Sequence, residues 1–290
     1  MPPPRWRRIL SWVRKHPVKT VLLLIAAFLL YEIATIPWFS IGTLVTQNPG
    51  ETALMRQRIR ESETNGKKLA IRQSWVRLAR IPQHLQDAVI VAEDGTFYSH
   101  SGVDWFEVRE SIEKNVKERR AARGGSTITQ QLAKNLYLST SKDPLRKAKE
   151  FIITLLLERR LSKSRILEIY LNVIEWGPGV FGADAAARTY FGKPAAALTL
   201  EESLRMAAVI PSPLRHRPDS NSRYVTRRKE IVRRRMMSRS FIPFDDEEEA
   251  APVATDTART VPVQVATEDS TAPADAVPAT ADSVGTGGAH

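Results

Sequence analysis

The stretch GGSTITQQLAKN, residues 124–135, predicts an amphipathic helix with a polar start. Ile128, Leu132 and Leu136 recur at the spacing of one helical face, so we expect them to face a core. Ser126 can cap the helix, and the two glycines before it allow close backbone approach. Because helix N-termini attract phosphates, this start suits a phosphate group.

The polar side of the same helix carries groups that suit a sugar phosphate. Thr127, Gln131 and Lys134 follow one another at spacings of four and three, which places them along one face. Hydrogen-bonding groups that end in a cation favour binding of a phosphorylated sugar. The alternative is an ordinary exposed polar face.

A second stretch, AEDGTFYSHSGVDW at residues 92–105, begins as an apolar run ends. Glu93 and Asp94 precede a glycine turn, where an acid can point into a cleft and act in acid–base chemistry. The alternative is structural: one acid caps a helix or turn, and His100 is a satisfied structural histidine.

A third stretch begins with Asp143 and Pro144, an N-cap followed by proline at the first helical position. These two residues predict a helix through LRKAKEFIITLLLERR, residues 145–160. The apolar spacing predicts a buried stripe made of Leu145, Ala148, Ile152 and Leu156.

One carboxylate on this helix lies beside two cations. Glu150 is four residues from Arg146 and three from Lys147, and both spacings bring side chains together on a helix. The alternative is a solvated face, on which such pairs contribute only a few tenths of a kcal/mol.

Helical spacing continues through most of residues 66–240. Thr199 and Glu202 form a capping box before SLRMAAVI, and residues 165–172 form an amphipathic pattern with three inward residues, Ile166, Ile169 and Tyr170. Few segments alternate as strands do. We therefore expect a mainly α-helical domain.

The segment from Val18 to Trp38 contains the apolar run VLLLIAAFLL and follows several basic residues, so it predicts a membrane anchor with a cytoplasmic N-terminus. A spanning helix needs about 20 residues. It must therefore include Lys19 and Glu32, whose side chains could snorkel to the interfaces. A cleaved signal peptide is the alternative, but no convincing cleavage site follows the apolar run.

Composition removes several classes of chemistry. The chain has no cysteine, which excludes disulfides and thiolate chemistry, and its five histidines show no paired metal-ligand spacing. Residues 245–290 hold ten acidic residues and one basic residue, so the basic excess behind the net charge of +11 lies before them. That excess suggests an anionic partner, and the low-complexity end suggests a disordered tail.

The three stretches together resemble the peptidoglycan glycosyltransferases, glycosyltransferase family 51. The family's first motif, ED-x-x-F-x-x-H-x-G, is met by Glu93, Asp94, Phe97, His100 and Gly102. The others, in order, are G-x-S-T-I-T-Q-Q-L-x-K-N at 124–135, R-K-x-x-E at 146–150, K-x-x-I-L-E-x-Y-L-N at 163–172 and G-x-x-x-A-A-x-x-Y-F-G-K at 182–193. The likeness covers residues 85–235.

The resemblance implies a lysozyme-like, two-lobed, mainly α-helical domain that polymerises lipid II, with inversion at the donor anomeric carbon and release of undecaprenyl pyrophosphate. It implies Glu93 as the general base and Glu150 as a second acid. The substrate-binding residues would be Ser126, Thr127, Gln130, Gln131, Lys134, Asn135, Lys142, Arg146 and Lys147. Lys142 stands near the place where many members carry arginine, and a lysine lacks the bidentate fork.

The same resemblance implies no required cofactor, although a divalent cation is compatible with it. The expected partners are lipid II, glycan linked to undecaprenyl pyrophosphate, the membrane, and other cell-wall synthesis and division proteins, with no nucleic acid. We expect a bacterial inner-membrane protein with its catalytic domain outside the cytoplasm. The predicted parts are a basic N-terminus (1–17), an anchor (18–38), a linker (39–65), the glycosyltransferase domain (66–240) and an acidic tail (241–290).

Two other classes stay as alternatives. A cell-wall hydrolase would use two acids on a similar fold, but it has no pyrophosphate leaving group to bind. A membrane-tethered basic module could bind nucleic acid or anionic lipid through RRAARGG and RRKEIVRRR. The S-x-x-K pattern at 139–142 lacks its transpeptidase partner motifs, so the protein is expected to be monofunctional.

Overall fold

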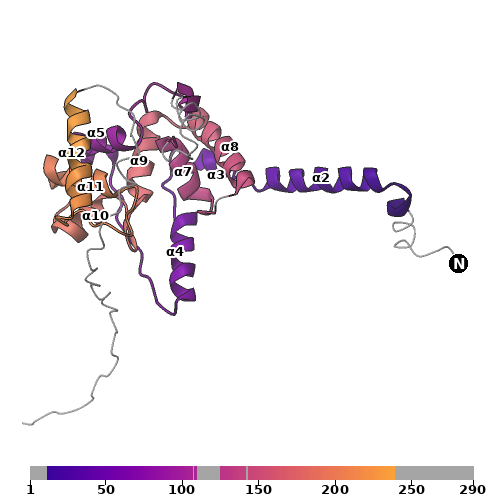
Figure 1. Ribbon diagram of the computed structural model, residues 1–290, viewed down its shortest axis with the longest axis horizontal. Helices are drawn as coiled ribbons and strands as arrows, with labels where there is room; N and C mark the ends of the chain where they lie inside the picture. Colours follow the sequence, from indigo (N-terminus) through magenta and orange to yellow (C-terminus); the bar gives the residue numbers. More distant parts are fainter. Residues whose placement is uncertain (1–11, 107, 110–124, 142, 239–290) are drawn as a thin grey trace, which may run out of the picture. The chain divides into compact units, whose positions relative to one another are not determined.

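The computed structural model describes residues 12–106, 108–109, 125–141 and 143–238. These residues are mainly helical, as the sequence predicts (Figure 1). The helices are α2 (Pro17–Ala34), α3 (Ser40–Thr43), α4 (Ala53–Thr64), α5 (Gln83–Glu93), α7 (Ile128–Tyr137), α8 (Pro144–Arg160), α9 (Lys163–Val173), α10 (Ala183–Phe191), α11 (Leu200–Val209) and α12 (Arg223–Ser238), with short 3-10 helices η1 (Leu78–Arg80) and η2 (Ala195–Ala197). Gly124, Lys142 and the predicted tail at 241–290 lie outside the described residues.

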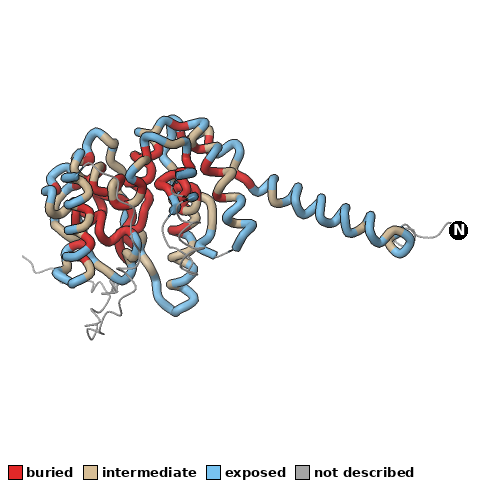
Figure 2. Tube along the Cα trace, turned by 45° about the horizontal axis from the view of Figure 1, so that its top comes forward, coloured by how far each residue is buried: buried red, intermediate tan, exposed pale blue. Residues whose placement is uncertain are grey.

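The core forms where helices from distant parts of the sequence meet. Helix α7 packs against α8 and α9, and α5 packs against α11 and α12. Figure 2 shows the buried residues gathered in the interior of the folded domain, while α2 is exposed along its length. The inward residues predicted for α7 and α9 are buried, and Thr199 caps α11 with Glu202 as expected. The likeness to lysozyme and the two lobes stay predictions.

The buried stripe of α8 differs from the predicted one. Its buried residues are Glu150, Ile153, Thr154 and Leu157, whereas Leu145 is 43% exposed and Ala148 is also exposed. Ile152 and Leu156 are partly buried and pack against the core, so the prediction was wrong for Leu145 and Ala148 only. The reason is that residues 151–157 are apolar at nearly every position. Such a run does not determine which side of the helix faces the core.

The segment expected to be a linker, residues 39–65, is folded. Ile41 and Leu44 join the main core, and the N-terminal turn of α4 buries Leu54 and Met55 against Phe181. Thr52 caps α4 through the backbone N–H of Met55. The folded domain therefore begins soon after the apolar helix.

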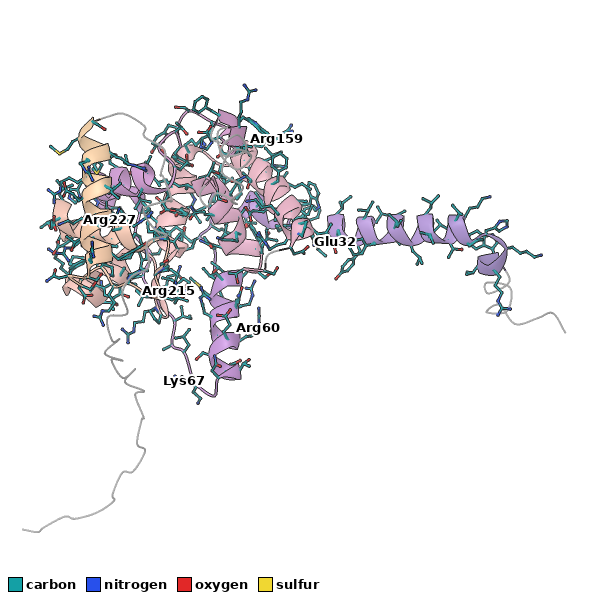
Figure 3. The ribbon with its side chains drawn as sticks, viewed as in Figure 1. Glu32, Arg60, Lys67, Arg159, Arg215 and Arg227 are labelled. Atoms are coloured by element: carbon teal, nitrogen blue, oxygen red, sulfur yellow. The ribbon has the colours of Figure 1, made fainter. Side chains whose placement is uncertain are left out.

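Helix α2 is the one described helix that is long and apolar enough to cross a membrane, with a mean hydropathy of 1.9. None of its residues is buried within the protein. Glu32, labelled near the end of α2 in Figure 3, forms an ion pair with Lys149 of α8. The Lys149 ammonium also donates to the Thr35 hydroxyl at 2.7 Å. The acid of the predicted anchor thus has a partner in the folded domain.

A small sheet, which the sequence pattern did not predict, joins the segments around α5 and α9. Strand β3 (Val180–Phe181) lies between β1 (Arg72–Gln73), to which it is parallel, and β2 (Glu175–Gly177), to which it is antiparallel. Arg72 pairs with Val180 in this register. Strands of two or three residues are too short to show alternation, which is why the pattern missed them.

Gly182 directly follows β3 and lies close to the backbone of α9, so a substitution there probes the packing between the sheet and that helix. Its φ of +83° and ψ of 151° are a conformation that essentially only glycine adopts, and a Cβ there would lie 2.7 Å from the backbone oxygen of Asn172. Gly192 is a matched control, because its φ is +68° but nothing lies within 4 Å of an added Cβ.

We expect Gly192→Ala to lower the free energy of unfolding by about 1 kcal/mol, the cost of a left-handed backbone alone. Gly182→Ala should lower it by about 3 kcal/mol or more, because the backbone must also move. Urea unfolding of the full chain in detergent, followed by circular dichroism, measures both. Equal losses in the two variants would contradict the close packing at Gly182.

Candidate active site

Asp94, at the end of α5, connects the first two sequence motifs. One carboxylate oxygen accepts from Nε2 of His100 at 2.8 Å, and the other accepts from the backbone N–H of Ile128 at 2.9 Å. The N–H of Gly102 donates to Nδ1 of His100, so the ring proton is on Nε2. Asp94 and His100 therefore have the structural role that the sequence offered as an alternative. Of the two acids, Glu93 is the one that could take part in chemistry.

The start of α7 is held by its own residues. The cap is Thr127, not the predicted Ser126: its hydroxyl accepts from Gln130 N, while the Gln130 side chain accepts from Thr127 N. The Thr127 hydroxyl also donates to the carbonyl of Gly102 at 2.6 Å. Thr127 and Gln130 are both buried, as is Asn135. This geometry makes Thr127 and Gln130 part of the helix start, and their contact with substrate stays a prediction.

One carboxylate oxygen of Glu93 accepts a hydrogen bond, and the other has no partner among the described residues. Oε2 accepts from Nε2 of Gln131 at 2.9 Å, whereas Oε1 is buried without a hydrogen-bond partner among the described residues. Burial raises the pKa of Glu93, and the Gln131 hydrogen bond and the charges of Arg228 and Lys134 oppose that rise. A carboxylate with a free oxygen and a raised pKa suits a general base.

Glu150, in contrast, is held at both oxygens. Nη1 of Arg146 donates to Oε2 and Nζ of Lys147 donates to Oε1, each at 2.5 Å. The Glu150 side chain is buried, and Nζ of Lys147 also donates to the Ser126 hydroxyl at 3.3 Å. The predicted pairs are therefore formed. Glu150 positions the two cations beside the start of α7.

Lys134 lies within electrostatic reach of both glutamates. Burial lowers the pKa of its ammonium, Arg146 and Lys147 lower it further, and the charges of Glu150 and Glu93 raise it. Lys134 makes none of the side-chain hydrogen bonds or ion pairs formed within the described part of the chain. The structure thus brings the predicted cations Lys134, Arg146 and Lys147 together, with one ammonium available to an anion.

Sequence reasoning missed Arg228, whose charge lowers the pKa of Glu93. The residue belongs to the basic run at 227–235, which the sequence alone presented as a surface feature. A signal was present, because Val225, Arg228 and Val232 share one helical face and all three are buried in α12. An arginine that shares a helical face with buried valines is expected to point into the interior.

An unpartnered carboxylate oxygen beside a cluster of cations defines a class of site: acid–base chemistry on an anionic substrate. No group of three His, Asp or Glu side chains within the described ranges could hold a metal ion. The apolar helix α2 is suited to anchoring such a domain at a membrane.

Comparison with known proteins identifies the family. The sequence pattern of the transglycosylase family matches residues 61–237. The biosynthetic peptidoglycan transglycosylase of Janthinobacterium sp. (strain Marseille) is 42% identical over 232 residues, 80% of this chain and 96% of that protein. The protein of the same description in Dechloromonas aromatica is 44% identical over 220 residues, 76% of this chain and 94% of its own length. That of Methylobacillus flagellatus is 46% identical over 192 residues, covering 66% and 84%. This chain belongs to the transglycosylase family.

Two glutamates with different partners, Glu93 and Glu175, are expected to affect stability in opposite directions. Because burial raises the pKa of Glu93 above its ordinary value of 4.5, keeping it ionised destabilises the fold once the pH exceeds that value. We expect Glu93→Gln to raise the unfolding temperature at pH 7.5. A rise of about 2–4 °C would correspond to about 1 kcal/mol. The gain should shrink as the pH falls towards 4.5.

Glu175 serves as the contrasting variant. Burial also raises its pKa, but both of its oxygens accept from Nε of Arg58, at 2.9 and 3.1 Å. Burial alone would favour a neutral side chain here as at Glu93, but Glu175→Gln also breaks this ion pair and leaves the Arg58 guanidinium with Glu61 alone. We expect the lost pair to dominate and the unfolding temperature to fall. Scanning calorimetry of both variants checks the pair of predictions. A Glu93→Gln variant less stable than the wild type at pH 7.5 would contradict the unpartnered oxygen.

Proposed function

We propose that this protein is a peptidoglycan glycosyltransferase that polymerises lipid II into glycan strands and releases undecaprenyl pyrophosphate. The observation that carries the proposal is the site: one oxygen of Glu93 has no hydrogen-bond partner among the described residues, and Lys134, Arg146 and Lys147 gather nearby. The names of the relatives, biosynthetic peptidoglycan transglycosylase, support the same substrate class.

In this proposal, Glu93 takes the proton from the 4-hydroxyl of the acceptor sugar as the hydroxyl oxygen bonds to the anomeric carbon of the donor. The bond from that carbon to the pyrophosphate breaks, and the configuration inverts. Negative charge grows on the leaving pyrophosphate, where the ammonium of Lys134 and the cations that Glu150 positions would stabilise it. No covalent intermediate on the enzyme is needed.

The hydrogen-bond partners of Glu150 favour glycosyl transfer over hydrolysis of a glycan. A glycan hydrolase places a second carboxyl group across the bond as acid, base or nucleophile. Both oxygens of Glu150 are already taken by Arg146 and Lys147. Their charge is better suited to a pyrophosphate leaving group than to the neutral bond of a finished glycan.

Localisation follows from the substrate as well as from α2. We infer that α2 anchors the protein in the inner membrane with its basic N-terminus in the cytoplasm, which leaves the domain on the side where strands are built. The lipid tails of donor and acceptor stay in that bilayer. Other cell-wall synthesis and division proteins are proposed partners. We do not propose nucleic acid as a partner, because two residues of the basic run at 227–235, Lys229 and Arg233, form ion pairs with Glu201.

The first test removes the proposed base. Glu93→Gln keeps the size of the side chain but cannot take a proton, so we expect polymerisation to fall by about a hundredfold or more. Purified protein is incubated with lipid II, with and without a chelator of divalent cations, and the products are separated by glycan length. Glu63→Gln, an exposed glutamate of α4, is the matched control. Wild-type turnover in Glu93→Gln would overturn the assignment.

A second test concerns the cations. If Lys134, Arg146 and Lys147 stabilise charge on the leaving group, their alanine variants should lose kcat more than substrate affinity, with Lys134→Ala the most severe. Arg159, an exposed residue of α8 labelled in Figure 3, is the control for a lost surface charge. Steady-state kinetics on the four alanine variants measures the effect. Near-normal kcat in the first three would remove the pyrophosphate role.

A further inference from the structure

The side-chain amide of Gln131 bridges Glu93 and a buried tyrosine. Its Nε2 donates to Oε2 of Glu93 at 2.9 Å, and its oxygen accepts from the hydroxyl of Tyr170 at 2.9 Å. Tyr170 lies on α9 and is fully buried. Three helices, α5, α7 and α9, thus meet in one short chain of hydrogen bonds.

The two groups that the Gln131 side chain contacts, the Glu93 carboxylate and the Tyr170 hydroxyl, favour one orientation of its amide. A side-chain amide has a donating end and an accepting end. If the Gln131 amide turned over, its oxygen would face Oε2 of ionised Glu93, and two acceptors would meet without a proton between them. The Tyr170 hydroxyl would also lose the Gln131 oxygen, the acceptor of its one hydrogen bond among the described residues.

We propose that Tyr170 is a positioning residue for the reaction: it fixes the Gln131 amide, which holds Oε2 of Glu93 and leaves Oε1 as the oxygen that takes the proton. The inference rests on the proposed function, because it requires Glu93 to be the base. Tyr170 itself touches no reacting atom. It acts through Gln131.

The charges around Glu93 show how the chain of bonds affects its ionisation. Burial raises the pKa of Glu93 and Asp94 of α5 adds to the rise, while Gln131 and Lys134 of α7 and Arg228 of α12 lower it. Burial raises the pKa of Tyr170 well above its usual value, so the hydroxyl keeps its proton at neutral pH.

Loss of the Tyr170 hydroxyl should therefore misplace the base and shift its ionisation in a defined direction. The amide oxygen of Gln131 is left without its donor, and the amide no longer has one preferred orientation. Because the hydrogen bond from Gln131 lowers the pKa of Glu93, that pKa should rise when the bond weakens. The protonated fraction then increases at low pH, and the acid limb of the rate profile moves to higher pH.

The experiment compares Tyr170→Phe with Tyr190→Phe in the full chain. Tyr190 is the matched control, because this partly buried tyrosine also loses a hydroxyl, which donates to the carbonyl of Trp176 at 3.2 Å and not to Gln131 or Glu93. Rates of lipid II polymerisation are measured against pH. In parallel, carbon-13 NMR of glutamate-labelled protein follows the titration of Glu93, assigned by its absence in Glu93→Gln.

We expect Tyr170→Phe to lower kcat by about tenfold to a hundredfold with KM nearly unchanged, and to move both the acid limb and the Glu93 titration to higher pH. Tyr190→Phe should do neither. If Tyr170→Phe keeps the wild-type kcat, acid limb and titration, the inference is wrong while the proposed function stands. If the wild type does not polymerise lipid II, the proposed function fails, and the NMR titration still decides whether Tyr170 sets the pKa of Glu93.

Discussion

The two hydrogen bonds of Asp94 hold together the segments on which the site depends. Both oxygens of this buried carboxylate are occupied, which stabilises the fold because an unpaired charge in a core is destabilising. One oxygen accepts from His100, and the other accepts from the N–H of Ile128. The first N–H groups of a helix have no partner within the helix, so α7 supplies this bond without losing one of its own. The end of α5 and the start of α7 therefore stay together, and Glu93 reaches Gln131.

Burial has opposite consequences for the two glutamates of the site. Glu150 receives a cation at each oxygen, so its charge is matched inside the protein and holds Arg146 and Lys147 in place. Glu93 receives one neutral donor, Gln131, and its other oxygen has no hydrogen-bond partner in the described structure. Burial without a full set of partners raises the pKa of Glu93. The same residue type is thus a paired anion on α8 and, in the proposed function, a proton acceptor at the end of α5.

The cations form a cluster that folding alone would not favour. The charges of Arg146 and Lys147 lower the pKa of Lys134, which means that the three repel one another. Glu150 offsets part of this repulsion, and an anionic substrate would offset the rest. Under the proposed function, binding of the substrate would therefore stabilise the cation cluster. That arrangement is common where charge develops during a reaction, because the stabilising groups are already in place.

Local features of the sequence determined the helices and the inventory of reactive groups. The inward residues of α7 and the caps at Asp143 and Thr199 follow from spacing and hydrogen bonding within a few residues. The phase of α8, the folded segment at 39–65 and the hydrogen-bond partner of Glu93 depended on contacts between residues far apart in the chain. The spacing on α8 already predicted the two cations at Glu150. Only the tertiary structure decided that Glu93 keeps one oxygen without a partner among the described residues, because its one donor, Gln131, comes from another helix.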